Sequence, residues 1–193
     1  MKLTPQLSKT ILENKELLEF LKPQIDPWDA TPLKGYVDIN NKVKGKYGEL
    51  FVEKMMKSLG HKVEPAKGSN AGHDRIINDI LVEIKFGVAH RGAKNKKGTT
   101  LTDVFSFNHF SIKKDWQRAI IVGMNIDCQP YVVWFDKADF IDEEIAKRDS
   151  ERKYFSRQQS GKRGGNDDWM FMTNTNSWAR FMNEPWVKSI SEW

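Results

Sequence analysis

Charged side chains interrupt a segment that otherwise reads as a buried strand, GHDRIINDILVEIKFG (residues 72–87). Its apolar residues alternate as one face of a strand requires, at Ile80, Val82, Ile84 and Phe86. Glu83 and Lys85 occupy the opposite face, with their Cα atoms roughly 6–7 Å apart. At that spacing a carboxylate and an ammonium group can reach one common point.

Asp74 supplies a second carboxylate if the chain turns tightly at Asn78-Asp79. Two converging carboxylates attract a hard cation such as Mg²⁺, which lowers the pKa of its bound water and stabilises charge on a phosphate oxygen. A nearby lysine orients or deprotonates the attacking water, or offsets charge in the transition state. The alternative is a half-exposed hairpin whose ion pair contributes about 0–1 kcal/mol and has no function.

The Glu-x-Lys spacing is not informative by itself, because it occurs three times, beginning at Glu13, Glu83 and Glu151. The first and third copies fall in segments expected to be helical and solvated, where such pairs are routine. The middle copy alone lies on an alternating strand, with an aspartate nine residues before it and a glycine-containing loop upstream.

The elements that must position these groups can be read from the apolar pattern. Thr4–Leu21 is expected to be a helix, and 22–43 an irregular connection with three prolines. A clear helix is expected at about 44–59, ending at Gly60. The remaining expected elements are strands at 61–65, 104–110, 119–124 and 131–135, and a helix from Asp139 to about Phe155.

This order of elements predicts an α/β (α+β) domain with a central mixed β-sheet flanked by helices. We expect an N-terminal helix and irregular extension (1–43), a core that carries the site (44–140), and a helical and aromatic C-terminal extension packed on the same domain (141–193). The C-terminal aromatic residues are expected to serve core or dimer packing in preference to stacking on bases.

Composition excludes several classes of protein. The chain has 193 residues, 39% hydrophobic and 30% charged, which is a globular balance and neither a disordered nor a membrane one. No apolar run can span a bilayer, and the N-terminus lacks a signal-peptide core. The single cysteine, Cys128, excludes an internal disulfide and fits a cytoplasmic, reducing setting.

The net charge is 31 − 26 = +5, and the positive charge gathers in two glycine-containing loops, 88–98 and 157–166. Such loops let the backbone approach phosphate and supply donors to phosphates and base edges, although they could also be ordinary solvated loops. The expected contacts with double-stranded DNA are Arg91, Lys94, Lys96, Lys97, Arg157, Gln158, Gln159, Lys162, Arg163 and Asn166.

Asp74 followed by Glu83-x-Lys85 resembles the signature of the PD-(D/E)xK nuclease superfamily, which has the restriction-endonuclease-like fold. The resemblance covers about residues 44–135. It implies an acidic helix, a strand, the Asp-bearing strand, the Glu-x-Lys strand, a further helix and another strand. One departure is His73, which stands where the superfamily often has proline.

The resemblance also implies roles for individual residues. Asp74 and Glu83 match the metal-binding carboxylates, and Lys85 matches the catalytic lysine. Glu49 matches a helix acid that assists the metal, and the Ile84 carbonyl would face it. His73 could touch substrate or metal, but a lone histidine is more often a packing or surface residue, and Asp79 fits a turn better than the site.

The function that follows is Mg²⁺-dependent hydrolysis of phosphodiester bonds in double-stranded DNA, with Mn²⁺ expected to substitute. The sequence is most like a type II restriction endonuclease, prokaryotic or phage-encoded. A homodimer is expected to cut both strands of a palindromic target. Phage, homing, repair and junction-resolving nucleases would share this site, and a non-catalytic nucleic-acid-binding module is the alternative from another class.

Overall fold

The computed structural model describes residue 26 and residues 28–68, 71–90, 98, 104–148, 151–157, 168–172 and 177–193. The chain divides into two compact units, Met1–Val37 and Asp38–Trp193. The described part of the first unit is a series of turns. In it, the Asp26 carboxylate accepts hydrogen bonds from the backbone N–H groups of Trp28 (2.9 Å) and Gly35 (2.6 Å). The expected helix at 4–21 lies outside the described residues.

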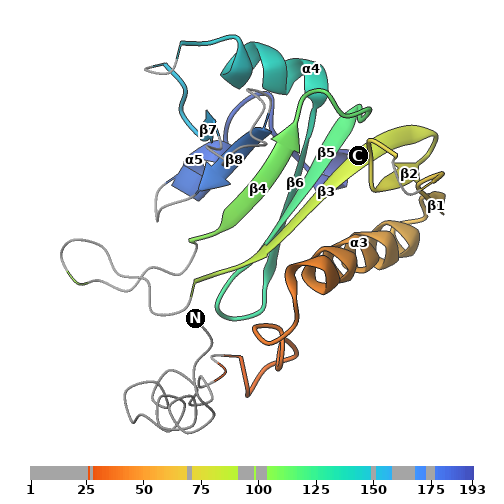
Figure 1. Ribbon diagram of the computed structural model, residues 1–193, viewed down its shortest axis with the longest axis vertical. Helices are drawn as coiled ribbons and strands as arrows, with labels where there is room; N and C mark the ends of the chain where they lie inside the picture. Colours follow the sequence, from red (N-terminus) through yellow and green to blue (C-terminus); the bar gives the residue numbers. More distant parts are fainter. Residues whose placement is uncertain are drawn as a thin grey trace, which may run out of the picture. The chain divides into compact units, whose positions relative to one another are not determined.

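A six-stranded mixed sheet forms the centre of the second unit (Figure 1), in the order β1-β2-β3-β5-β6-β9. Its strands are β1 (Val63–Pro65), β2 (Arg75–Ile77), β3 (Ile80–Val88), β5 (Arg118–Met124), β6 (Pro130–Asp136) and β9 (Lys188–Ser189). β3 and β5 run parallel, and every other neighbouring pair is antiparallel. The expected fold class, a mixed α+β domain with a central mixed sheet, is confirmed.

The β2–β3 hairpin turns at the two residues that the sequence indicated. Asn78 and Asp79 both have positive φ, 49° and 66°, which a two-residue hairpin turn requires and which Asn and Asp tolerate. The Asn78 side chain also accepts a hydrogen bond from the Lys62 N–H (3.0 Å), which ties the turn to the approach to β1. The hairpin and its register follow from this local chemistry.

Helix α3 (Asn41–Ser58) covers one face of the sheet. It begins three residues earlier than expected because Asn40 caps it, accepting a hydrogen bond from the Val43 N–H (3.0 Å). Val52 and Met56 are fully buried against the sheet. Gly48 lies so close to β3 that a Cβ there would collide with Phe86, so the helix approaches the strand directly at this point.

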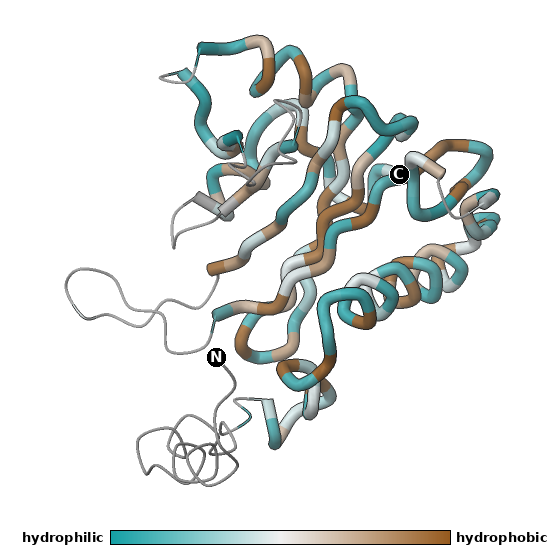
Figure 2. The backbone as a smooth tube through the Cα atoms, in the orientation of Figure 1, coloured by the Kyte–Doolittle hydropathy of each residue, from teal (hydrophilic) through white to brown (hydrophobic). Residues whose placement is uncertain are grey.

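A second, three-stranded sheet supplies the other layer, in the order β4-β8-β7. It consists of β4 (Ser106–Ser111), β7 (Phe155–Arg157) and β8 (Asp168–Met172), accompanied by α5 (Ser177–Met182). Figure 2 shows hydrophobic residues concentrated along the strands. The expected core role of the C-terminal aromatics is confirmed, because Trp169, Phe171, Trp178 and Phe181 are at most 1% exposed.

One expectation about a helix was wrong. The helix expected from Asp139 to about Phe155 is only α4 (Lys137–Phe140) and a π-helical turn, η1 (Ile141–Ile145), after which Phe155 begins β7. The reason is the buried Glu144 carboxylate, which accepts hydrogen bonds from the N–H groups of Tyr154 (3.4 Å) and Phe155 (3.3 Å) and folds the chain back.

The resemblance implied a helix between β3 and β5, and residues 91–97 and 99–103 of this connection lie outside the described residues. Its described residues, 89–90, 98 and 104–117, contain strand β4 and no helix. A last 3₁₀ turn, η2 (Ile190–Glu192), follows β9. None of the helices in the described ranges combines the length and the apolar character that crossing a bilayer would require.

Candidate active site

Asp74 lies immediately before β2, and its side chain reaches across to β3. Its Oδ2 atom accepts a hydrogen bond of 2.7 Å from the Ile84 N–H, and its own N–H donates to the Val82 carbonyl at 2.9 Å. Asp74 is therefore held by the residues on both sides of Glu83.

Glu83 is completely buried, and its carboxylate faces Lys85 on the same side of β3. Lys85 Nζ donates to Glu83 Oε1 at 2.6 Å and lies 5.4 Å from the centre of the Phe110 ring. Glu83 Oε2 is also buried, and it has no hydrogen-bond partner among the described residues. A buried polar atom without a partner costs about 1–3 kcal/mol, and more when it is charged, so this oxygen marks a place where a ligand would be favourable.

A second lysine, Lys114, reaches the same carboxylate and was not expected from the sequence. Its Nζ atom lies 3.2 Å from Glu83 Oε1, although the two residues are 31 positions apart. Lys114 belongs to the turn between β4 and β5, and no motif or spacing marks it. Only the folding of that turn against the hairpin brings it to the site.

The Asp74 carboxyl is in an environment that disfavours its charged form. Burial raises the pKa of Asp74 above its usual value, and the neighbouring Glu83 carboxylate raises it further. The hydrogen bond from Ile84 and the charge of Lys85 act in the opposite direction but are weaker. The two carboxylates are thus close enough to repel each other in the absence of a cation.

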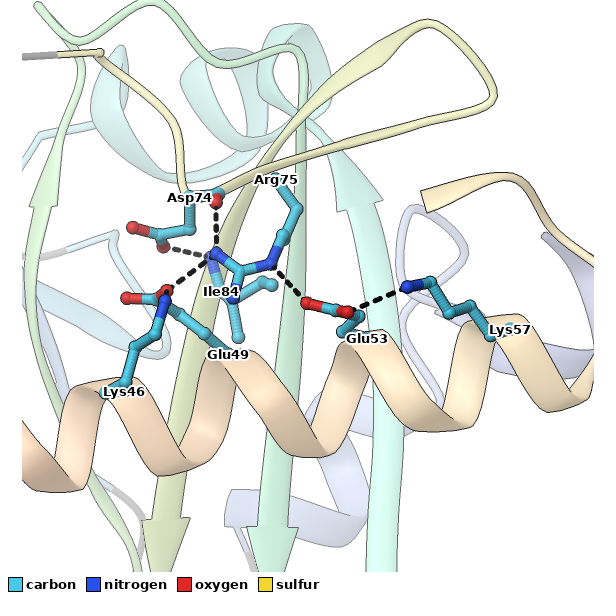
Figure 3. Close-up of polar contacts among 7 residues, drawn as sticks. All are labelled: Lys46, Glu49, Glu53, Lys57, Asp74, Arg75 and Ile84. Carbon is cyan, nitrogen blue, oxygen red and sulfur yellow. Dashed lines mark hydrogen bonds and ion pairs between the residues drawn. The ribbon is translucent and has the colours of Figure 1, made fainter. Parts of the chain in front are cut away.

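Glu49 projects from α3 toward Asp74, but it is engaged by Arg75 (Figure 3). The Glu49 Oε2 atom lies 2.6 Å from Arg75 Nη1 and 3.1 Å from Lys46 Nζ. Arg75 is almost entirely buried, and it also donates to the Asp74 carbonyl (2.7 Å) and to Glu53 Oε2 (3.1 Å). This buried guanidinium fixes the start of β2 to α3, and the sequence analysis did not single it out.

The other candidate residues, Ile84, His73 and Asp79, lie in different environments. Ile84 meets Asp74 through its N–H group, and its side chain packs in the core beneath α3. Both ring nitrogens of His73 are buried and find no hydrogen-bond partner in the described ranges. Asp79 occupies the exposed hairpin turn, as expected for a turn residue.

Most of the expected DNA contacts cannot be placed. Arg157 ends β7, and its guanidinium lies 5.5 Å from the centre of the Trp169 ring. The other nine lie outside the described residues, namely Arg91, Lys94, Lys96, Lys97, Gln158, Gln159, Lys162, Arg163 and Asn166.

The donor set fits Mg²⁺ in the manner usual for enzymes that act on phosphates. Within the described ranges, no three His, Cys, Asp or Glu side chains converge on one point. Asp74 and Glu83, however, present two mutually repelling carboxylates, and Glu83 Oε2 has no partner there. Because Mg²⁺ is commonly held by one or two carboxylates together with waters and substrate phosphates, two such groups are sufficient.

The chain has low similarity to known proteins. No protein-family model matches the chain, and no curated protein matches it significantly. One solved structure to which the chain is similar is that of a bacterial homing endonuclease, with 15% sequence identity and a TM-score of 0.36. The alignment covers 64% of this chain and 86% of that one. The function proposed below therefore rests on the site.

Proposed function

We propose that this protein is a Mg²⁺-dependent endonuclease that hydrolyses phosphodiester bonds in double-stranded DNA. The observation that supports this most directly is the buried Glu83 carboxylate. One of its oxygens bonds Lys85 (2.6 Å), the other has no partner in the described structure, and Asp74 lies beside it. Two carboxylates and a lysine at one point suit metal-assisted attack of water on phosphate.

Asp74 and Glu83 would hold the cation, with Glu49 and the Ile84 carbonyl as further candidates. When bound, Mg²⁺ supplies a water of lowered pKa and offsets charge on a phosphate oxygen. Lys85, held at Glu83 Oε1, orients the attacking water. The water oxygen forms a bond to phosphorus as its proton passes to solvent, and the bond from phosphorus to the 3′-oxygen breaks. That oxygen takes a proton from solvent water and leaves as a hydroxyl. The products carry a 5′-phosphate and a 3′-hydroxyl.

The finer proposal is a sequence-specific enzyme of the type II restriction class. The described residues of each chain contain one candidate site, so cutting both strands of a duplex calls for two chains. A symmetric dimer would read a palindromic target. The two basic loops, 88–98 and 157–166, are the proposed DNA-reading segments.

The test is incubation of the purified chain with plasmid and phage DNA, with Mg²⁺, with Mn²⁺, or with EDTA. Discrete fragments in either metal and none in EDTA are expected. A smear would indicate a nonspecific nuclease, and cutting of branched DNA alone would indicate a resolvase. DNA binding without cleavage of any substrate would indicate a non-catalytic DNA-binding module and would contradict the enzyme proposal.

A variant pair sharpens the test. Lys85→Ala is expected to reduce cleavage by at least about 10²-fold, a magnitude typical for loss of a group that assists proton transfer, and to leave DNA affinity nearly unchanged. The control is Lys57→Ala, because Lys57 is also ion-paired (2.8 Å to Glu53) but lies on α3, away from Glu83. Equal activity of the two variants would remove Lys85 from the mechanism.

A further inference from the structure

The Glu83 carboxylate is approached by two lysines that come from separate parts of the chain. Lys85 Nζ and Lys114 Nζ both contact Glu83 Oε1, at 2.6 Å and 3.2 Å. Lys85 is on the same strand as Glu83, whereas Lys114 is in the turn between β4 and β5. Lys85 alone already pairs with Glu83, and Lys114 brings a second ammonium group to the same carboxylate oxygen.

The turn that carries Lys114 is fixed on several sides. The buried Trp116 donates its indole N–H to the Ser111 carbonyl (2.8 Å), and Lys137 Nζ donates to the Lys114 carbonyl (2.6 Å). Gly72 packs so tightly against this turn that a Cβ there would collide with the Asp115 backbone. The Lys114 backbone is therefore held in place next to the segment that leads to Asp74.

The two lysines differ in how open they are to solvent. The Lys85 side chain is 16% exposed, and its ammonium group lies over the Phe110 ring (5.4 Å). The Lys114 side chain is 41% exposed. A lysine ammonium has three donors, of which the contact with Glu83 uses one. Lys114 can therefore offer a donor to an anion arriving from solvent while its turn stays fixed.

Resting on the function proposed above, we propose that Lys114 is a substrate-contacting residue that binds a non-bridging oxygen of the phosphate to be cut. The two lysines would then have different roles, since Lys85 orients the attacking water and Lys114 binds the phosphate. A phosphodiester adds one negative charge, which Lys114 can meet while Lys85 remains at Glu83 Oε1.

The experiment measures DNA binding and cleavage in Lys114→Ala, Lys114→Arg and the control Lys57→Ala. A fluorescently labelled duplex is titrated by anisotropy in EDTA at several NaCl concentrations. Loss of one phosphate contact is expected to reduce the slope of log affinity against log salt by about 1, uniformly across duplex sequences. Lys114→Arg is expected to restore the slope, and Lys57→Ala to keep the wild-type value.

Cleavage kinetics supply the second readout. Lys114→Ala is expected to raise KM for plasmid about 10-fold, a factor that corresponds to loss of one charge-assisted contact, with a smaller effect on kcat than Lys85→Ala has. A lowered melting temperature with an unchanged salt slope and KM would show that Lys114 is only structural, and would overturn the inference.

The two proposals can fail separately. If the wild-type chain cuts DNA and Lys114→Ala matches it in slope and KM, the nuclease proposal stands and the Lys114 inference falls. If the wild-type chain binds DNA without cutting it, the nuclease proposal falls, and the salt slope still decides whether Lys114 contacts phosphate. A wild-type chain that neither binds nor cuts DNA overturns both.

Discussion

At the scale of single residues, Asp74 carries the clearest electrostatic signature of the site. Burial and the Glu83 carboxylate raise its pKa, so the folded chain binds a proton there more tightly than the unfolded chain does. The stability that this proton contributes is fully present below the unfolded-state pKa. It is lost as the pH rises through the higher folded-state pKa, so above that pKa the ionised carboxylate destabilises the fold.

We therefore expect Asp74→Asn to raise the melting temperature without divalent cations at pH values above the raised pKa of the native carboxyl, and the gain to shrink as the pH falls through that pKa. The asparagine carbonyl can still accept the Ile84 N–H bond. Asp79→Asn is the control, because its carboxyl lies at an exposed turn. A loss of stability in Asp74→Asn throughout the range from acidic to alkaline pH would contradict this account of the carboxyl.

The same variant separates a cation site from an unoccupied acidic pair. At a Mg²⁺ concentration one hundred times its Kd, binding would stabilise the wild-type chain by about 2.7 kcal/mol. Asp74→Asn is expected to lose most of this stabilisation, whereas Asp79→Asn retains it. Calorimetric melting with and without Mg²⁺ measures the difference and requires no DNA.

At the scale of elements, the contact between α3 and β3 depends on one glycine. Gly48→Ala places a Cβ against Phe86 and is expected to destabilise the fold by about 1–3 kcal/mol, the usual cost of overpacking. Gly45→Ala, in the same helix with nothing within 4 Å of the added Cβ, is expected to stabilise it by up to about 1 kcal/mol. Urea unfolding of both variants tests the contrast, and effects of equal sign would refute it.

The elements that could be predicted are those governed by local chemistry. Asn78-Asp79 specifies its turn, and the alternation through β3 places Glu83 and Lys85 on one face. The helix expected after Asp139 failed because Glu144, a charged residue that reads as solvated, is buried and bonds the backbone at 154–155. The second sheet was missed because its pairing of β4 with β8 is a long-range contact.

The residues of the site fall into the same two groups, those that local sequence brings together and those that long-range packing brings together. Asp74, Glu83 and Lys85 are close in sequence and come together through one hairpin, so pattern reasoning found them. Arg75 and Lys114 were missed because their partners lie 22 to 31 residues away. An arginine beside a hairpin reads as exposed, and only the packing of α3 over β2 buries it.

At the scale of the whole molecule, a monomer would bring to a duplex the one candidate site that the described part of the chain contains. If two chains act together on a duplex, the initial cleavage rate is expected to rise faster than in proportion to protein concentration, up to the point where the dimer is saturated. Light scattering after size-exclusion chromatography, with and without duplex, gives the mass directly. A single-chain mass under all conditions, with cleavage linear in concentration, would exclude the proposed homodimer.

The hydrogen bond from the Ile84 N–H to Asp74 Oδ2 gives this molecule an internal indicator. The amide proton of Ile84, in the central sheet, is hydrogen-bonded to the Asp74 carboxyl group, which is proposed to bind the metal. In a ¹⁵N-labelled sample, the resonance of that one amide is expected to shift as Asp74 titrates and again when a cation is added. Spectroscopy of a single peak could thus follow the state of the site before any substrate is known.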